Sequence, residues 1–316
     1  MNDKYFRYLI LNKLVKKAAI LETVKNSLEQ KGFKAEDKNK PVYGGKIKVN
    51  SGNPNVVITV PDNPIVSGIK KPDGTYDNGK YNVFIQIKSG VGATKAGINT
   101  IIVEANANID GGLSGAYDKL FPNADWAKTA LANIQSSLSK YFGNVSLNRL
   151  GVGNFSAGYS GADKLLSDPK LKNNITDVIS LDGLHYGKKG KVNEAAMKPW
   201  LDFAKEAKKD PSKKFVMLHT SIDPGAYIST TESSQYLIDQ LGAKREGYNG
   251  PSTFAGIKPV SEANSGGVSI VQLYDKQDPY TINGRPNVPG TSGYQHIQAA
   301  RSLGDAFGEY LRDWNG

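Results

Sequence analysis

The pattern of apolar and polar positions changes near residue 46. Before this point, Leu and Val residues recur at three-to-four-residue spacing over residues 5–31, which predicts one amphipathic helix. Residues 35–45 are polar and contain proline and paired glycines, which indicates a linker. We therefore expect a basic helical arm and linker over residues 1–45, and a second domain over residues 46–316.

From residue 46 onward, short apolar runs alternate with segments of helical periodicity. The predicted strands are 46–49, 55–60, 82–87, 99–105, 148–155, 175–181, 214–219 and 268–273. The predicted helices are 126–141, 157–166, 194–207, 233–241 and 296–314. This alternation predicts an α/β fold, with a mostly parallel sheet of about eight strands covered by helices on both faces. In such sheets ligands bind at the carboxyl ends of the strands.

Two further predictions rest on turn residues. The Ser-Gly-Asn-Pro sequence at 51–54 predicts a hairpin between the first two strands. The segment 242–267 is rich in Gly, Ser and Pro and has no clear periodicity. Because long irregular loops in compact domains are usually functional, we expect this segment to form a lid or rim over the site.

The sharpest local motif joins the strand 148–155 to the following helix. It reads Asn-Phe-Ser-Ala-Gly, centred on Ser156. The motif resembles the G-x-S-x-G nucleophile elbow of the α/β-hydrolase family of serine esterases and lipases. Asn154 replaces the first glycine, and we expect it to be tolerated because Asn adopts left-handed φ more readily than most residues. The resemblance implies Ser156 as nucleophile and the backbone N–H of Ala157 as an oxyanion donor.

Three other interpretations of the same stretch stay open. Ser160 lies in a second approximate elbow, but inside the predicted helix. Gly151, Gly153 and Ser156, with Asp182 ending the next strand, approximate a dinucleotide fingerprint and would indicate a nucleotide-dependent oxidoreductase. That fingerprint prefers Gly or Ala at its third position and lies near the start of its domain. A turn of small residues without chemistry is the third interpretation.

The candidate base follows from the chain's three histidines, His185, His219 and His296. The family order is Ser, then acid, then His, with the histidine after the last core strand. His296 has that placement. The other two precede the last strand, so we expect them to be structural or to line the pocket.

Two aspartates are candidates for the acid that orients the base. Asp182 ends the strand after the nucleophile and precedes a glycine, whereas Asp223 follows the strand after that. Either could hold the imidazole in its tautomer. We favour Asp182 and keep Asp223 as the alternative; a turn or capping aspartate is the plain interpretation of each.

The remaining site residues come from loops at the strand ends. The family places a second oxyanion donor after the third strand, which implies the N–H of Gly90 or Val91. Aromatic and histidine side chains near the strand ends predict a substrate pocket; these are Tyr159, His185, His219, Tyr227 and Tyr294. No metal-ligand spacing is convincing, so no metal is expected.

Composition narrows the function classes. The absence of cysteine excludes disulfides, a thiol nucleophile and thiolate metal sites. Residues 1–48 hold 12 Lys/Arg against 5 Asp/Glu, which is +7 of the net charge of +10. Because these lysines are scattered, we expect a solvated helix face with no nucleic-acid partner. The apolar stripe of the helix could mediate oligomerisation, attach the chain to a larger assembly or pack on the main domain. No signal peptide or membrane span is evident, which predicts a cytoplasmic protein unless lysis or a particle releases it.

Together these features predict a serine hydrolase that cleaves a carboxylic ester, or an amide, of a small or polymer-borne substrate. The chemistry requires no cofactor. The alternatives are a nucleotide-dependent oxidoreductase and an inactive hydrolase-like scaffold that serves binding or assembly.

Overall fold

The computed structural model describes residues 47–61, 66–73, 75–88, 100–106, 114–224, 227–250, 254, 257–273, 310 and 314. The chain divides into two compact units, and the larger comprises Val42–Lys70 and Thr75–Gly316. The description below concerns this larger unit. The predicted N-terminal helix and linker lie outside the described residues.

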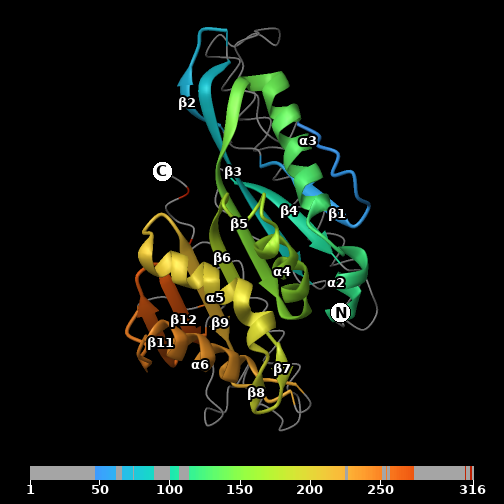
Figure 1. Cartoon of the computed structure of the whole chain (residues 1–316). Helices are drawn as coiled ribbons and strands as arrows, with labels where there is room; N and C mark the ends of the chain where they lie inside the picture. Colours follow the sequence, from blue (N-terminus) through green and yellow to red (C-terminus); the bar gives the residue numbers. More distant parts are fainter. Residues whose placement is uncertain are drawn as a thin grey trace, which may run out of the picture. The chain divides into compact units, whose positions relative to one another are not determined.

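Ten strands of the described residues pair into one mixed sheet, in the order β1-β4-β3-β5-β6-β9-β12-β11-β10, with β2 paired to β3 (Figure 1). The strands are β1 (Val56–Thr59), β2 (Ser67–Lys70), β3 (Tyr76–Lys88), β4 (Thr100–Asn106), β5 (Gly143–Phe155), β6 (Ile175–Leu181), β9 (Lys214–His219), β10 (Glu246–Gly247), β11 (Ser261–Ser265) and β12 (Val268–Gln272). The six strands from β4 to β12 along this order are parallel. The flanking strands β1, β2, β10 and β11 are antiparallel to their neighbours.

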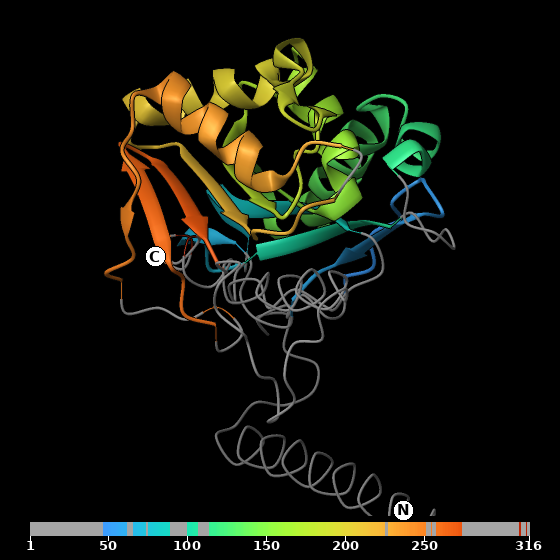
Figure 2. The same ribbon diagram turned by 90° about the horizontal axis from the view of Figure 1, so that it is seen from below.

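The described helices all cover one face of this sheet (Figure 2). They are α2 (Ser114–Leu120), α3 (Asp125–Phe142), the 3₁₀ turn η2 (Ser156–Gly158), α4 (Tyr159–Ser167), α5 (Glu194–Lys209) and α6 (Thr230–Leu241). Alternation along the strands separates two cores: Val83 and Ile85 of β3 face the helices, whereas Phe84 faces the opposite side. None of these helices is both long and apolar enough to cross a membrane.

The mostly parallel α/β sheet agrees with the sequence prediction, but the strand count and the helix placement differ. Ten strands replace the predicted eight, because β2, β10 and β11 are polar strands without the apolar alternation that predicts a strand. Helices on both faces were predicted, yet every described helix packs on one face. The last predicted helix, 296–314, lies outside the described residues apart from Tyr310 and Trp314.

The predicted hairpin of residues 46–60 was wrong. Residues 47–50 form no strand, and β1 pairs antiparallel with β4, with Val56 opposite Ala105. The hairpin lies later, where β2 pairs with the start of β3. The turn residues at 51–54 were read correctly as a turn, but the pairing partner of β1 depends on a distant strand that no local signal indicates.

The predicted lid over residues 242–267 contains regular structure instead. Strand β11 pairs antiparallel with β12 through a tight Gly266–Gly267 turn, and β10 adds to its far side. The turn lies against the end of α5: a Cβ on Gly266 would lie 2.1 Å from the Lys208 carbonyl oxygen. This segment therefore extends the sheet at one edge.

Strands β3 and β5 are the longest, with 13 residues each. Along their amino-terminal halves, side chains of matched positions bond across the pair, which forms a polar ladder. Its bonds are Asn144 Nδ2 to Asn78 Oδ1 (3.2 Å), Lys80 Nζ to Ser146 Oγ (2.9 Å) and Asn148 Nδ2 to Asn82 Oδ1 (3.1 Å). The ladder adds side-chain bonds between the two strands along a stretch in which their register shifts twice, between Tyr76 and Gly79 and between Tyr81 and Asn82.

Trp314 fills the core on the face away from the helices. Its ring is 3% exposed and packs edge-on against Phe84, and the guanidinium of Arg149 lies 5.8 Å from its centroid. Asn82 Nδ2 donates to its carbonyl oxygen at 3.2 Å. A Cβ on Gly151 would lie 2.9 Å from the indole, so the glycine makes room for it.

Candidate functional site

Ser156 lies where β5 meets the helical segment that begins with η2. Its φ is +49°, which is unusual for a residue with a side chain. The strand ends at Phe155, and η2 leads directly into α4. This is the strained strand-to-helix turn that the sequence predicted, and the left-handed conformation falls on Ser156 itself. Asn154 continues the strand without a positive φ, so the turn does not use the capacity for left-handed φ for which we expected Asn to be tolerated there.

Small residues let α4 begin close to the sheet. A Cβ on Gly158 would lie 2.4 Å from the carbonyl oxygen of Ile87 on β3, so no other residue fits there without moving backbone. Asn154 is fully buried, and a Cβ on Gly183 would lie 2.5 Å from its Nδ2. The alternative serine, Ser160, lies inside α4 and donates to the Ala157 carbonyl at 3.4 Å.

Asp182 lies at the end of β6, next to the end of β5. It is 2% exposed and has φ +42°. Its Oδ1 accepts three hydrogen bonds, from the Thr220 N–H (3.0 Å), the Thr220 hydroxyl (2.9 Å) and the Thr230 hydroxyl (2.8 Å). Its Oδ2 accepts from the Thr220 hydroxyl at 3.1 Å. The donors therefore concentrate on one oxygen of a buried carboxylate.

Sequence reasoning missed the two threonines that hold this carboxylate. Thr220 follows β9, so it reaches the same sheet edge as Asp182. Thr230 is the first residue of α6, where a capping box between Ser229 and Glu232 fixes the helix start. The S-x-x-E pattern at Ser229 was a readable signal for the helix start, but nothing local indicated that Thr230 would face Asp182.

His219 is fully buried behind Thr220. Its Nδ1 lies 3.1 Å from the Thr220 carbonyl oxygen and its Nε2 lies 3.4 Å from Arg245 Nη1. Burial, and to a smaller extent the nearby Arg245 guanidinium, lower the pKa of His219 to about 4. The ring is therefore neutral at pH 7, and its Nδ1–H donates a hydrogen bond to the Thr220 carbonyl oxygen. Its position is that of a structural histidine, not of an open pocket wall.

The buried histidine predicts a pH dependence of stability. The unfolded chain binds more protons at this position between about pH 4 and 6.5, so the free energy of unfolding should rise with pH there, by up to about 3 kcal/mol. Denaturant titrations of wild type and His219→Gln at both ends of this window should show a smaller rise in the variant. An unchanged rise would contradict a neutral, buried His219.

Asp163 of α4 should change the free energy of unfolding with pH in the direction opposite to His219, and it therefore supplies the control. Burial raises its pKa to about 6, so the folded chain binds more protons here than the unfolded chain. This contribution is present below the ordinary pKa of the carboxyl and is lost as pH rises through about 6. Asp163→Asn should therefore make the rise in stability with pH steeper, whereas His219→Gln should make it shallower.

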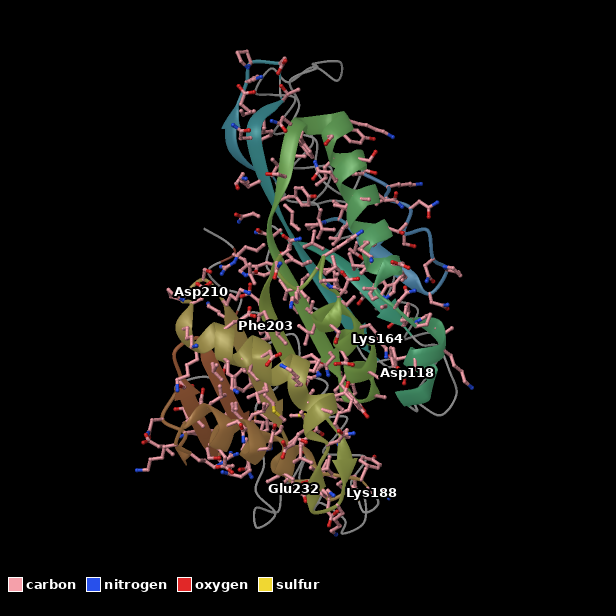
Figure 3. All side chains as sticks on the ribbon, viewed as in Figure 1. Asp118, Lys164, Lys188, Phe203, Asp210 and Glu232 are labelled. Atoms are coloured by element: carbon pink, nitrogen blue, oxygen red, sulfur yellow. The ribbon has the colours of Figure 1, made fainter. Side chains whose placement is uncertain are left out.

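Asp223, the alternative acid, lies at the surface. Its side chain is 41% exposed and its Oδ2 lies 2.7 Å from the Nζ of Lys189. Lys189 belongs to the turn of a small hairpin formed by β7 (Gly187–Lys188) and β8 (Lys191–Val192). Figure 3 labels Lys188 of this hairpin and Glu232 of α6, and Glu232 Oε1 accepts from the hairpin's Gly190 N–H at 2.8 Å. Asp223 thus has a solvated cationic partner, whereas Asp182 is enclosed.

Three of the predicted pocket residues form a row of rings beside the elbow. The ring centroids of Tyr159 and His185 are 6.0 Å apart, and those of His185 and Tyr227 are 5.0 Å apart. Tyr159 is nearly buried, while Tyr227 is 47% exposed, so the row leads from the interior to the surface. The His185 Nδ1 lies 3.0 Å from the Ile228 carbonyl oxygen, which orients the ring.

Four predicted site residues lie outside the described residues: His296, Gly90, Val91 and Tyr294. The geometry of base and second oxyanion donor therefore stays a prediction from sequence. Within the described part of the chain, no group of three or more His, Asp or Glu side chains could hold a metal ion.

No protein-family model matches the sequence, and no curated protein matches it. One solved structure with some similarity is the crystal structure of Aspergillus fumigatus lipase B, at 11% sequence identity and a TM-score of 0.25. The alignment covers 45% of this chain and 38% of the lipase chain. The comparisons thus assign this chain to no family.

Proposed function

We propose that the chain is a serine hydrolase of the α/β-hydrolase type that cleaves carboxylic esters. The observation that carries the proposal is the conformation of Ser156: a serine at φ +49°, between a central parallel strand and a helix. Strain at a residue with a side chain is most common where function requires it. Asp182, buried and held by hydrogen bonds from Thr220 and Thr230 at the neighbouring strand end, supports the same proposal.

In the proposed mechanism, Ser156 Oγ attacks the ester carbonyl while His296 takes its proton. The backbone N–H of Ala157, with that of Gly90 or Val91, stabilises the oxyanion of the tetrahedral intermediate. The intermediate collapses as His296 returns the proton to the leaving alcohol. Water, activated by the same histidine, then hydrolyses the acyl-enzyme and restores Ser156.

Asp182 is the acid in this proposal. With the Thr220 N–H and the Thr220 and Thr230 hydroxyls donating to Oδ1, and the Thr220 hydroxyl also within reach of Oδ2, the carboxylate has a fixed orientation. A carboxylate held in this way can accept a hydrogen bond from the Nδ1–H of an imidazole and stabilise the imidazolium during the reaction. The row formed by Tyr159, His185 and Tyr227 would bind part of the substrate.

A fluorophosphonate probe tests the proposal directly. Intact mass spectrometry of the full chain should show one adduct on the wild type and none on Ser156→Ala, because only an activated serine reacts. Ser160→Ala, which changes a serine four residues further along in α4, is the matched control and should label like the wild type. Labelling that persists in Ser156→Ala, or no adduct on folded wild type, would exclude Ser156 as nucleophile.

A further inference from the structure

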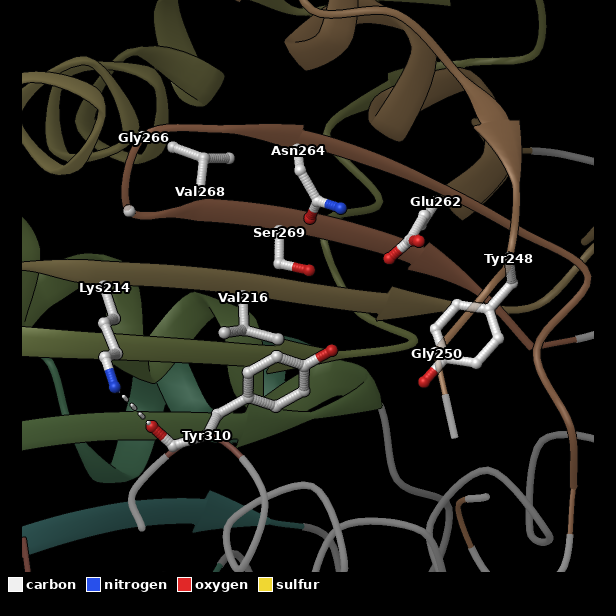
Figure 4. A pocket seen from close by; sticks show the side chains of 11 residues that line it. Lys214, Val216, Tyr248, Gly250, Glu262, Asn264, Gly266, Val268, Ser269 and Tyr310 are labelled. Atoms are coloured by element: carbon white, nitrogen blue, oxygen red, sulfur yellow. Dashed lines mark hydrogen bonds between the residues drawn. The ribbon is translucent and has the colours of Figure 1, made fainter. Parts of the chain in front are cut away.

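A pocket with both apolar and polar lining lies on the face of the sheet opposite the described helices (Figure 4). Its volume is about 400 Å³, within the usual range for small-molecule sites. Val216 of β9 and Ser269 of β12 form the floor, and Glu262 and Asn264 of β11 extend it toward the sheet edge. These positions alternate with residues that face the helices, such as Phe215 and Ile270.

Three neighbouring side chains present hydrogen-bonding groups to this pocket. Asn264 lies directly opposite Ser269 on the antiparallel pair, and Glu262 lies two residues before Asn264 on the same face. None of the three has a hydrogen-bond or ion-pair partner among the residues that the structure describes. A carboxylate, an amide and a hydroxyl together offer both acceptors and donors within one small area.

Two tyrosines flank the pocket on the side away from the strands (Figure 4). The Tyr310 ring stacks on Phe254 with an interplanar angle of 8° and a centroid distance of 6.1 Å, which fixes its orientation. The Tyr248 ring folds over Gly250, where a Cβ would lie 2.4 Å from the Tyr248 hydroxyl. The rings give the pocket apolar surfaces next to its polar floor.

The pocket is lined by one basic and one acidic side chain, so the charges of its lining balance. Lys214 lies at one end, where its Nζ donates to the Tyr310 carbonyl oxygen at 3.2 Å, and Glu262 lies at the other end. A ligand with a net charge would meet one unfavourable end, whereas a neutral ligand with several hydroxyls can donate to Glu262 and accept from Asn264 and Lys214. A ring with an apolar face could also pack against a tyrosine.

We propose that this pocket binds a neutral sugar ring, either free or as the terminal unit of a glycan. The pocket is separate from Ser156, because Lys214 and Val216 lie in the first half of β9 whereas Ser156 follows the carboxyl end of the parallel strand β5. The site therefore binds sugar without taking part in ester cleavage, and it would exist even if Ser156 were not a nucleophile.

Saturation-transfer-difference NMR on the full chain tests this proposal. The probes are the methyl glycosides of glucose, galactose, mannose and N-acetylglucosamine, with choline as a cationic comparison. At least one glycoside should receive saturation and show a dissociation constant in the millimolar range. Asn264→Ala should weaken that binding at least about tenfold, because it removes an amide that both donates and accepts.

Two further variants make the result decisive. Glu262→Gln keeps the shape of the side chain and should also weaken binding, whereas Asn173→Ala, which removes an exposed amide before β6, should bind like the wild type. The proposal is overturned if no glycoside binds, if choline binds and the glycosides do not, or if both pocket variants bind like the wild type.

Discussion

Asp182→Asn should lower the kcat for hydrolysis of p-nitrophenyl acetate about 10⁴-fold. The backbone N–H of Thr220 can only donate, so it requires an acceptor at the position of Oδ1, where the Thr220 and Thr230 hydroxyls also donate. The amide nitrogen of the variant must therefore occupy the position of Oδ2. There it would donate to the imidazole instead of accepting from it, which stabilises the wrong tautomer of the base.

Asp223→Asn is the matched control, because it makes the same chemical change at the other candidate acid. Asp223 is paired with Lys189 at the surface, so this variant should keep kcat within about twofold of the wild type. Thr230→Val keeps the Asp182 carboxylate but removes one donor, and its loss should be intermediate. A large loss in Asp223→Asn with little effect in Asp182→Asn would identify Asp223 as the acid.

Trp314→Ala should lower the free energy of unfolding by about 3–5 kcal/mol, as expected for deletion of a buried large aromatic side chain. The indole contacts Phe84, lies against Arg149 and fills the space that Gly151 leaves open, so its removal leaves a cavity. Arg149 Nε also lies 3.6 Å from the Asp177 carboxylate. Loss of the indole therefore removes packing around this ion pair as well. Urea titration of both proteins measures the difference.

Tyr141→Ala provides the comparison for an aromatic side chain at the surface. Tyr141 is 45% exposed at the end of α3, so its removal should change the free energy of unfolding by about 0.5 kcal/mol or less. Trp314→Phe, which retains a smaller ring, should fall between the two. Equal stability of Trp314→Ala and Tyr141→Ala would contradict the packing described for Trp314.

The elements predicted best from sequence are short apolar runs with polar flanks. Strands β6 and β9 match the predicted ranges 175–181 and 214–219, and α5 begins at the predicted Glu194. In these strands the apolar residues that form the local pattern are also the buried residues, because both faces of a central parallel strand are covered. Strand β11, second from the edge of the sheet and with the sequence Ser-Glu-Ala-Asn-Ser, has one buried residue and could not be recognised from apolar alternation.

Part of the candidate site could also be predicted from sequence, because it lies at the ends of recognisable apolar strands. The positions of Ser156 and Asp182 followed from strand ends, because the carboxyl ends of parallel strands meet at one edge. Local pattern could not show that Thr220 and Thr230 converge on Asp182, or that His219 is enclosed with Arg245, because these contacts join segments from different elements. The side-chain environment of each candidate acid, which distinguishes Asp182 from Asp223, is a tertiary property.

The polar ladder between β3 and β5 has a consequence for folding. Each of its three bonds joins residues 66 positions apart in the chain, so none can form before the ends of a long loop have met. Until then, Asn78, Lys80 and Asn82 are bonded to water and add nothing to the order of β3. The two longest strands must therefore become ordered together. The helix α3, which lies between them in the chain, has had time to form by then. Pairing of β3 with β5 is therefore expected to be a late and slow step in folding.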